Sequence, residues 1–265
     1  MNIYWFELRA NRRSTLGWTL ALAMLAVFFL AMFPTFANEA EQFKQVLGTM
    51  PEVVLKAVGV QIDSIASMLG FYSYIFLYIS LCGAIQAMGL GLSILSKETR
   101  EKTADFLLTK PVQRGAVVTA KLLAALTCLL ITNAVFVAVA SLMASVVKTD
   151  DYSVEAFLLV SATLPMIQLI FLALGLAAAM IAPRIRTVLP ITLGTVFAFF
   201  AIGMIGATAE DGALRYLSPL HYFDRAYIVS QESYETGFLL LSGVIVAVAV
   251  AFAYWRYSRR DVHVN

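Results

Sequence analysis

The sequence predicts an all-α, polytopic membrane protein with six transmembrane helices, and three observations lead to this prediction. Of its 265 residues, 60% are hydrophobic and 14% are charged, and the mean hydropathy is +0.81. Six apolar stretches reach or approach the length of about 20 residues that a helix needs to cross the hydrocarbon core. Alternating ten-residue strand patterns are absent, so helices rather than barrel strands must satisfy the backbone in lipid. We expect one membrane domain, residues 1–265.

The predicted spans are apolar runs that contain no Asp, Glu, Lys, Arg or His. They cover residues 16–36, 69–95, 122–147, 156–182, 188–209 and 237–255. The first run has the length of a signal peptide, but it lacks a small-residue cleavage site and ends in Met32, Phe33 and Pro34. We therefore interpret it as a retained span.

The distribution of Lys and Arg predicts how the spans are oriented. With a cytoplasmic N-terminus, 14 of the 19 basic residues fall on the inner side, and 12 of the 17 acidic residues fall on the outer side. Because short cytoplasmic segments are enriched in Lys and Arg, both termini are expected in the cytoplasm. We thus predict a multi-pass protein of a bacterial plasma membrane, with outer loops at residues 38–67 and 210–236.

The N-terminal segment and the first outer loop both have amphipathic patterns. Residues 1–15 combine aromatic side chains with three arginines, which fits either a helix lying at the inner interface or ordinary positive-inside anchoring. Residues 41–58 repeat apolar side chains at three- and four-residue spacing, which predicts an amphipathic helix interrupted near Pro51. This helix fits a position on the outer leaflet, a cap over the mouth of a pathway, or a packing lid without ligand contacts.

The last outer loop is rich in aromatic residues beside a proline. This composition predicts short helices that dip into the outer interface, and both a re-entrant gate and simple interfacial anchoring fit it. The candidate gate residues are Tyr216, Pro219, Tyr222 and Phe223.

Residues 96–121 form a charged island between two long apolar segments. A short helix over residues 96–108 would place Thr99, Thr103, Phe106 and Leu107 on one face, and Glu98, Glu101 and Asp105 beside Lys102 on the other. Pro111 then ends the helix. Because so short a helix is marginal alone in water, it is expected to gain order from the membrane domain or from a partner with basic groups. A solvated cytoplasmic turn is the alternative.

The absence of several motifs narrows the functional class. No GxxxxGK[ST] loop occurs, so this chain does not hydrolyse ATP by that route, and no HExxH or GxSxG motif points to a membrane enzyme. The uncharged spans disfavour a self-contained proton- or sodium-coupled carrier. A transporter component is left as the leading class.

The polar residues in the spans are neutral, and they are the candidates for lining a pathway. Gln86, Asn133 and Gln168 are the principal ones. Neutral walls with amides and hydroxyls fit lipids, peptides and amphiphilic drugs alike, so the substrate cannot be read from them.

No metal site and no nucleic-acid partner are predicted. The only two histidines, His221 and His263, fall on opposite sides of the predicted membrane, and each is expected at the surface. Cys82 and Cys128 lie in different spans and fit the role of small apolar fillers. None of the short inner segments offers the concentrated basic surface that nucleic acid requires.

At the charged island the chain resembles the permease subunits of ABC-2 type ATP-binding-cassette exporters. In that family the segment after the second span has an acidic residue, a turn, an LL-T-x-P motif, a basic residue and an apolar run. The matching positions here are Glu98, Thr103, Asp105, Leu107, Leu108, Thr109, Pro111, Arg114 and Lys121. Six spans, inner termini and the aromatic segment before the last span fit the same family. Thr103 departs from the pattern, because family members usually carry glycine near that position.

The resemblance implies a permease that works with a separate ATPase subunit. The region 96–114 would then be the cytoplasmic coupling region, seated in a groove of the ATPase. Its implied coupling residues are Glu98, Glu101, Lys102, Thr103, Asp105, Phe106, Leu107, Pro111 and Arg114. The implied partners are two ATPase copies, a second permease that is identical or homologous, and membrane lipid. The chain itself would bind no cofactor, and ATP and Mg would belong to the ATPase. The rival reading is a membrane scaffold or receptor component that docks a cytoplasmic protein without transport.

Overall fold

The structure is a computed structural model that describes residues 3–51, 54–55, 64–100, 113–149, 151–182, 185, 187–209 and 212–259. Every regular element in these residues is a helix. Six of the helices are long and apolar enough to cross a membrane, which confirms the predicted six-span, all-α architecture. They are α1 (Ile3–Asn38), α4 (Met68–Arg100), α6 (Arg114–Val147), α7 (Val154–Ile181), α8 (Val188–Ala209) and α11 (Thr236–Ser258).

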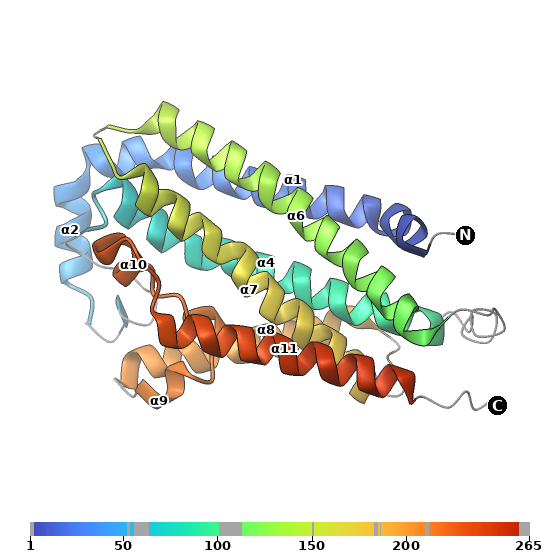
Figure 1. Cartoon of the computed structure of the whole chain (residues 1–265). Helices are drawn as coiled ribbons and strands as arrows, with labels where there is room; N and C mark the ends of the chain where they lie inside the picture. Colours follow the sequence, from blue (N-terminus) through green and yellow to red (C-terminus); the bar gives the residue numbers. More distant parts are fainter. Residues whose placement is uncertain are drawn as a thin grey trace.

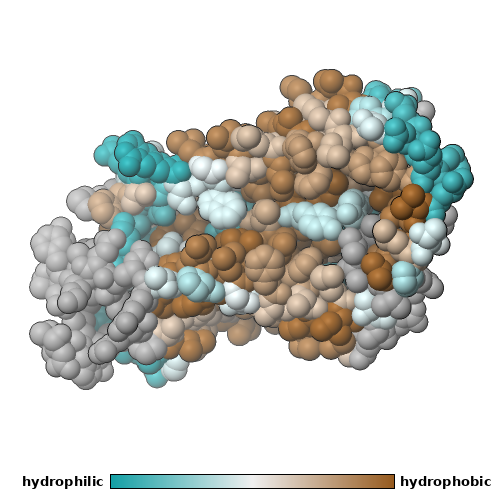
Figure 2. All heavy atoms as spheres, turned by 180° about the vertical axis from the view of Figure 1, so that it is seen from behind, coloured by the Kyte–Doolittle hydropathy of each residue, from teal (hydrophilic) through white to brown (hydrophobic). Residues whose placement is uncertain are grey.

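The six long helices form a bundle with α4 and α7 at its centre (Figure 1). Helices α1 and α6 pack together on one side of this central pair, and α8 and α11 lie on the other side. In the most apolar 18-residue window of each helix, 67% of α4 and 61% of α7 is buried, against 17% of α8. The outer helices therefore present most of their apolar surface to the surroundings. Figure 2 shows a broad hydrophobic surface over the middle of one face of the molecule.

The central pair packs backbone against backbone. A Cβ atom on Gly175 of α7 would lie 2.6 Å from the Met88 carbonyl oxygen of α4, and one on Gly91 would meet the Leu172 carbonyl oxygen. Small residues are what allow membrane helices to approach this closely. The pairing of Gly175 with Ala179, visible in the sequence, thus serves a contact within this chain.

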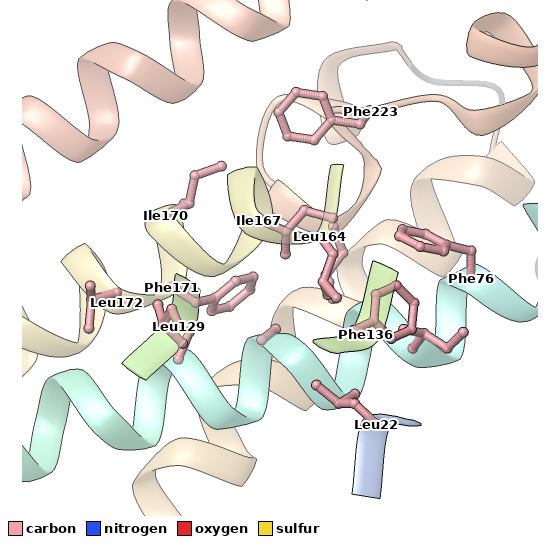
Figure 3. Packing of buried hydrophobic residues seen from close by; sticks show 14 of the residues in the cluster. Leu22, Phe76, Leu129, Phe136, Leu164, Ile167, Ile170, Phe171, Leu172 and Phe223 are labelled. Carbon is pink, nitrogen blue, oxygen red and sulfur yellow. The ribbon is translucent and has the colours of Figure 1, made fainter. Parts of the chain in front are cut away.

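Aromatic and branched side chains fill the rest of the interior. Tyr72 of α4 stacks on Phe157 of α7 with ring centroids 4.2 Å apart, and its hydroxyl bonds with the Ser161 hydroxyl at 2.8 Å. Figure 3 shows side chains of several helices meeting in this core, among them Phe76, Phe136, Leu164 and Phe171. The core holds the helices in one register over most of their length.

Three helices exceed the predicted spans by six residues or more. Helices α1, α4 and α6 contain 36, 33 and 34 residues. At about 1.5 Å per residue each measures roughly 50 Å, whereas the hydrocarbon core is about 30 Å thick. Residues 3–15, predicted as a distinct N-terminal segment, are continuous with the first span in α1. Likewise α4 runs without a break through residues 96–100, which were expected in the coupling helix.

The short helices gather at the end of the bundle opposite to both termini (Figure 1). Helix α2 (Ala40–Gly48) follows α1, and Phe43 stacks on Phe36 at 4.3 Å. The helix ends before Pro51, as the amphipathic pattern predicts. The last outer loop contains α9 (Gly212–Arg215), the 3₁₀-helix η1 (Pro219–His221) and α10 (Arg225–Gln231). Short helices rather than a free loop are therefore found in both segments.

Candidate functional site

The two ends of the predicted coupling region lie at the end of the bundle that carries both termini (Figure 1). Glu98 lies in the last turn of α4, and Arg114 is the first residue of α6. The Arg114 guanidinium donates to the Ser258 carbonyl oxygen of α11 at 3.1 Å. The other predicted coupling residues, Glu101, Lys102, Thr103, Asp105, Phe106, Leu107 and Pro111, lie outside the described residues. The coupling helix itself therefore stays a prediction.

Beneath these ends, a buried ion pair joins three helices. Lys121 Nζ of α6 lies 3.1 Å from Glu7 Oε1 of α1 and donates to the Ile94 carbonyl oxygen of α4 at 2.5 Å. The two charged side chains are 1% and 3% exposed. Charges this deeply buried require a partner, because desolvation of an unpaired charge is costly. The contact therefore fixes α1, α4 and α6 to one another.

The ion pair is not among the sequence-predicted site residues, although the sequence carries a signal for it. Glu7 is an acid among the basic residues of the inner side, and it continues the stripe of buried residues on α1. That stripe contains Glu7, Thr15, Thr19, Leu22, Ala26, Leu30 and Phe33. Spacings of three, four and eight residues place all of them on one helix face. Lys121, at the edge of a span, has the sequence context of an ordinary anchoring lysine.

Other contacts reinforce the same junction. The Tyr4 hydroxyl of α1 bonds with the Thr127 hydroxyl of α6 at 3.1 Å. The Lys97 ammonium of α4 lies 5.0 Å from the centre of the Phe6 ring. Within the described residues, Glu7 Oε2 and Ser96 Oγ are buried without a hydrogen-bond partner. The junction is therefore formed by three helices around a buried, polar centre.

At membrane depth, the three predicted pathway residues form one hydrogen-bonded chain. Gln168 Nε2 donates to Gln86 Oε1 at 3.1 Å, and Asn133 Nδ2 donates to Gln168 Oε1 at 2.6 Å. Gln86 Nε2 donates to Thr132 Oγ1 at 3.0 Å, and Thr132 also bonds with Thr19 at 2.9 Å. The chain thus crosses α1, α4, α6 and α7 inside the bundle. Amides bonded to one another stabilise helix packing in lipid, and their role in a pathway stays a prediction.

An uncharged groove with hydroxyls and amides among apolar side chains lies beside this chain, between α1, α4 and α8. Its volume is about 260 Å³. Its hydroxyls donate to backbone carbonyls of their own helices, for example Thr15 to Asn11 at 3.0 Å and Thr192 to Val188 at 3.0 Å. The oxygen lone pairs are then the groups that a ligand would meet. The lining residues are Asn11, Ser14, Thr15, Trp18, Ile85, Gln86, Gly89, Leu90, Ser93, Val188, Leu189 and Thr192. None of them carries a charge.

At the opposite end, the outer segment buries three of the four predicted gate residues, two of which are aromatic. Tyr222 and Phe223 are 3% and 4% exposed, and Phe223 reaches the core beside α7 (Figure 3). Pro219 is also buried, at the start of η1, whereas Tyr216 is 59% exposed. The Tyr222 hydroxyl donates to the Tyr216 carbonyl oxygen at 2.6 Å. The structure brings these residues together, and gating by them stays a prediction.

Arg215 holds the outer segment in its fold. Its guanidinium forms a two-pronged ion pair with Glu235, at 2.9 and 3.1 Å, and donates to the carbonyl oxygens of His221 and Tyr222 at 3.0 and 3.2 Å. It also lies 4.0 Å from the centre of the Phe238 ring. A planar group with five donors suits such a site better than an ammonium does. Arg215 therefore ties η1 to the start of α11.

His221 is half-buried, so the expectation of a surface histidine was wrong. Its ring occupies the space beside Gly203 of α8, where a Cβ would collide with Nδ1. The Ser218 hydroxyl donates to the Phe199 carbonyl oxygen at 2.8 Å, so the 3.2 Å contact between Ser218 and His221 Nδ1 requires a proton on the ring nitrogen. Burial, together with the positive charges of Arg225 and Arg215, lowers the pKa of His221 to about 4. The ring is therefore neutral at pH 7.

Among the described residues, no group of three or more His, Cys, Asp or Glu side chains is placed to hold a metal ion. The Cys82 and Cys128 thiols are free, and they lie in α4 and α6.

Comparison with known proteins identifies the class to which this fold belongs. The profile of the ABC-2 family transporter proteins matches residues 1–262. The match covers nearly the whole chain, including all six candidate spans. The protein therefore belongs to the ABC-2 family of transporter membrane proteins. Members of this family are permeases that lack ATPase activity of their own and partner an ABC ATPase. No curated protein matches the chain.

Proposed function

We propose that this protein is the membrane-spanning subunit of an ATP-driven exporter that works with two copies of a separate ATPase. Membership of the ABC-2 family over residues 1–262 is the observation that carries the proposal. In this reading the coupling region 96–114 docks into the ATPase, and a second permease, identical or homologous, completes the pathway. Both termini and the coupling region lie in the cytoplasm of a bacterial cell.

The architecture supports this assignment of sides. Both termini and the ends of α4 and α6 that flank the coupling region lie at one end of the bundle (Figure 1). In the described part of the chain, that end also carries most of the Lys and Arg residues, which favours the cytoplasmic side. The three long helices extend beyond the bilayer, so the coupling region is held away from the membrane surface, where an ATPase has room to bind.

Energy must come from a partner in this mechanism. A protein without an ATP site changes its conformation only through contacts that an energised partner makes differently in its two states. The coupling region has the carboxylates to contact a basic groove and connects directly to two long helices. It is the part of the chain best suited to receive such a contact.

The pathway is proposed to be neutral. The groove between α1, α4 and α8 offers uncharged hydroxyls and amides beside apolar walls. α8 is the least buried of the six long helices and so has free surface for a second permease. Neutral amphiphiles fit such a surface better than ions, which need charged partners or dense carbonyl coordination at membrane depth.

The experiment begins with the complex of permease and ATPase in phospholipid nanodiscs and vesicles. We expect the ATPase to co-purify with the chain, and ATP-dependent flux of a probe from a panel of fluorescent lipids, peptides and amphiphilic drugs. The triple charge reversal Glu98→Lys, Glu101→Lys and Asp105→Lys should release or uncouple the ATPase while the spans stay inserted. Full coupled ATPase activity in this variant would contradict the proposed docking site.

A matched control reverses charge at the opposite end of the bundle, where α2 begins. Glu39→Lys and Glu41→Lys alter the outer loop near α2, so they should leave binding of the ATPase unchanged. An ATPase that binds without any ATP-dependent flux would favour the alternative, a membrane scaffold or receptor component.

A further inference from the structure

The ion pair between Glu7 and Lys121 lies between the predicted coupling region and the membrane core. Lys121 is seven residues from the start of α6 at Arg114, and Ile94 is six residues from the end of α4 at Arg100. Lys121 therefore lies about two helical turns beyond the coupling region 96–114, and Ile94 lies just before its first residue. Counting about 20 residues back from the outer end of α6 at Val147, Lys121 lies beyond the hydrocarbon layer. The pair therefore belongs to the parts of α1, α4 and α6 that extend beyond the hydrocarbon layer, which together form a stalk.

Within this stalk, α1 is the helix without a covalent link to the coupling region. Helices α4 and α6 flank residues 101–113 directly, so a displacement of that segment acts on both through the backbone. Helix α1 is reached only through side chains. Besides the general packing of α1 on α6, the contacts that reach it at this level include Lys121 to Glu7 at 3.1 Å, Tyr4 to Thr127 at 3.1 Å, and Lys97 to Phe6 at 5.0 Å.

Of these contacts, the ion pair is the most deeply buried. Its side chains are 1% and 3% exposed, whereas Phe6 is 48% exposed. Lys121 also donates to the Ile94 carbonyl, so one ammonium group is bound to both other helices. A buried ion pair is a weak source of stability compared with apolar packing, and fixing register is its best-attested use. The ion pair is therefore suited to fixing the positions of α1, α4 and α6 along one another.

We propose that Glu7 and Lys121 are positioning residues that make α1 move together with α4 and α6 when the ATPase displaces the coupling region. The proposal rests on the proposed function, because it assigns the route by which force from the ATPase reaches the first span. A movement of α1 would change the shape of the uncharged groove, because Asn11, Thr15 and Trp18 of α1 line it.

The test measures hydrogen exchange in the complete complex in nanodiscs of phosphatidylethanolamine and phosphatidylglycerol. Deuterium uptake is compared without nucleotide and after trapping with ATP and vanadate. In the unaltered complex, we expect trapping to change uptake in peptides that cover residues 3–15 and 114–127. In Glu7→Gln with Lys121→Met, the change should persist in 114–127 and be lost in 3–15, while ATP hydrolysis continues. This double variant leaves no unpaired buried charge, so it is expected to fold.

Two further variants separate positioning from a general effect on the fold. Lys121→Arg keeps the charge and the donors, so it should retain the response of residues 3–15. Lys148→Gln breaks an exposed ion pair with Asp151 of 2.9 Å at the other end of α6, and it should behave as the unaltered protein. If residues 3–15 respond to ATP equally in the double variant, the ion pair does not transmit the movement. If 114–127 fails to respond even in the unaltered complex, the proposed coupling to an ATPase is wrong instead.

Discussion

The end of the bundle that carries both termini, which is the predicted inner end, and the opposite, predicted outer end each contain an ion pair, but the two pairs differ in structure. At the inner end, Lys121 and Glu7 are 1% and 3% exposed and connect helices that are far apart in the sequence. At the outer end, Arg215 and Glu235 are 28% and 24% exposed and stabilise a segment of about 20 residues. The cation of the inner pair is the compact ammonium group of Lys121. The cation of the outer pair is the planar guanidinium group of Arg215, which also donates to two backbone carbonyls. A buried ion pair suits a contact between packed helices, whereas an arginine that donates several hydrogen bonds suits a loop whose backbone carbonyls need partners.

Removal of the inner cation should have the largest effect. Lys121→Met leaves the Glu7 carboxylate buried without its partner, and we expect a loss of about 3–5 kcal/mol in unfolding free energy. Thermal unfolding in detergent, followed by tryptophan fluorescence, would measure the loss. Glu7→Gln added to this variant should recover most of it. If the double variant were as unstable as Lys121→Met, the loss would come from packing rather than from charge.

At the outer end, removal of the cation should cost less. Arg215→Gln loses hydrogen bonds made by a charged donor, but water can reach Glu235, so we expect a loss of about 2–3 kcal/mol. Arg215→Lys keeps the charge without the fork and should recover only part of this loss. Limited proteolysis of residues 212–235 would report the local change. Equal losses from Arg215→Gln and Lys121→Met would erase the contrast between the two ends.

Acid should loosen the outer end. The pKa of His221 falls from 6.5 to about 4 on folding, because the ring is buried beside Arg225 and Arg215, with Asp224 opposing them. Stability from the neutral ring is therefore complete above pH 6.5 and is lost as the pH falls toward 4. Between pH 7 and pH 5 we expect about 2 kcal/mol of loss. Comparison of melting curves for the parent and His221→Gln, which cannot titrate, would isolate this contribution.

The smallest effect is expected where an ion pair is fully exposed. Lys148 and Asp151 are joined at 2.9 Å, but their side chains are 45% and 98% exposed. Water and salt screen such a pair, so Lys148→Gln should leave the melting temperature unchanged. A clear fall in melting temperature would show that exposure does not govern the strength of ion pairs in this protein.

Hydropathy predicts the spans of this fold well, because lipid imposes the same length and composition on every spanning helix. It places the cores of all six helices but underestimates α1, α4 and α6 at their inner ends. Beyond the hydrocarbon layer, charged residues such as Glu7 are permitted in a helix, so a hydropathy window ends too early. Helical continuity there depends on tertiary contacts, which one sequence does not reveal.

The candidate site is predictable to a lesser degree. The sequence identifies Gln86, Asn133 and Gln168 because polar residues are rare in apolar spans, and the structure brings all three together. That they bond to one another inside the bundle follows from helix rotation, which weak amphipathicity leaves undetermined. The Glu7–Lys121 pair joins residues 114 positions apart, and no local pattern connects them. His221 was misplaced because its burial depends on the space beside a glycine of another helix.

The close approach of α4 and α7 limits where this protein can bend. Where Gly91 and Gly175 meet, no side chain separates the two backbones, so nothing at that crossing could repack. The pair therefore acts as a rigid spine, and any opening and closing has to occur at the looser seams along its flanks. Any side chain at Gly91 or Gly175 would collide with the backbone of the other helix and force α4 and α7 apart, so even substitution by alanine is expected to disturb this packing.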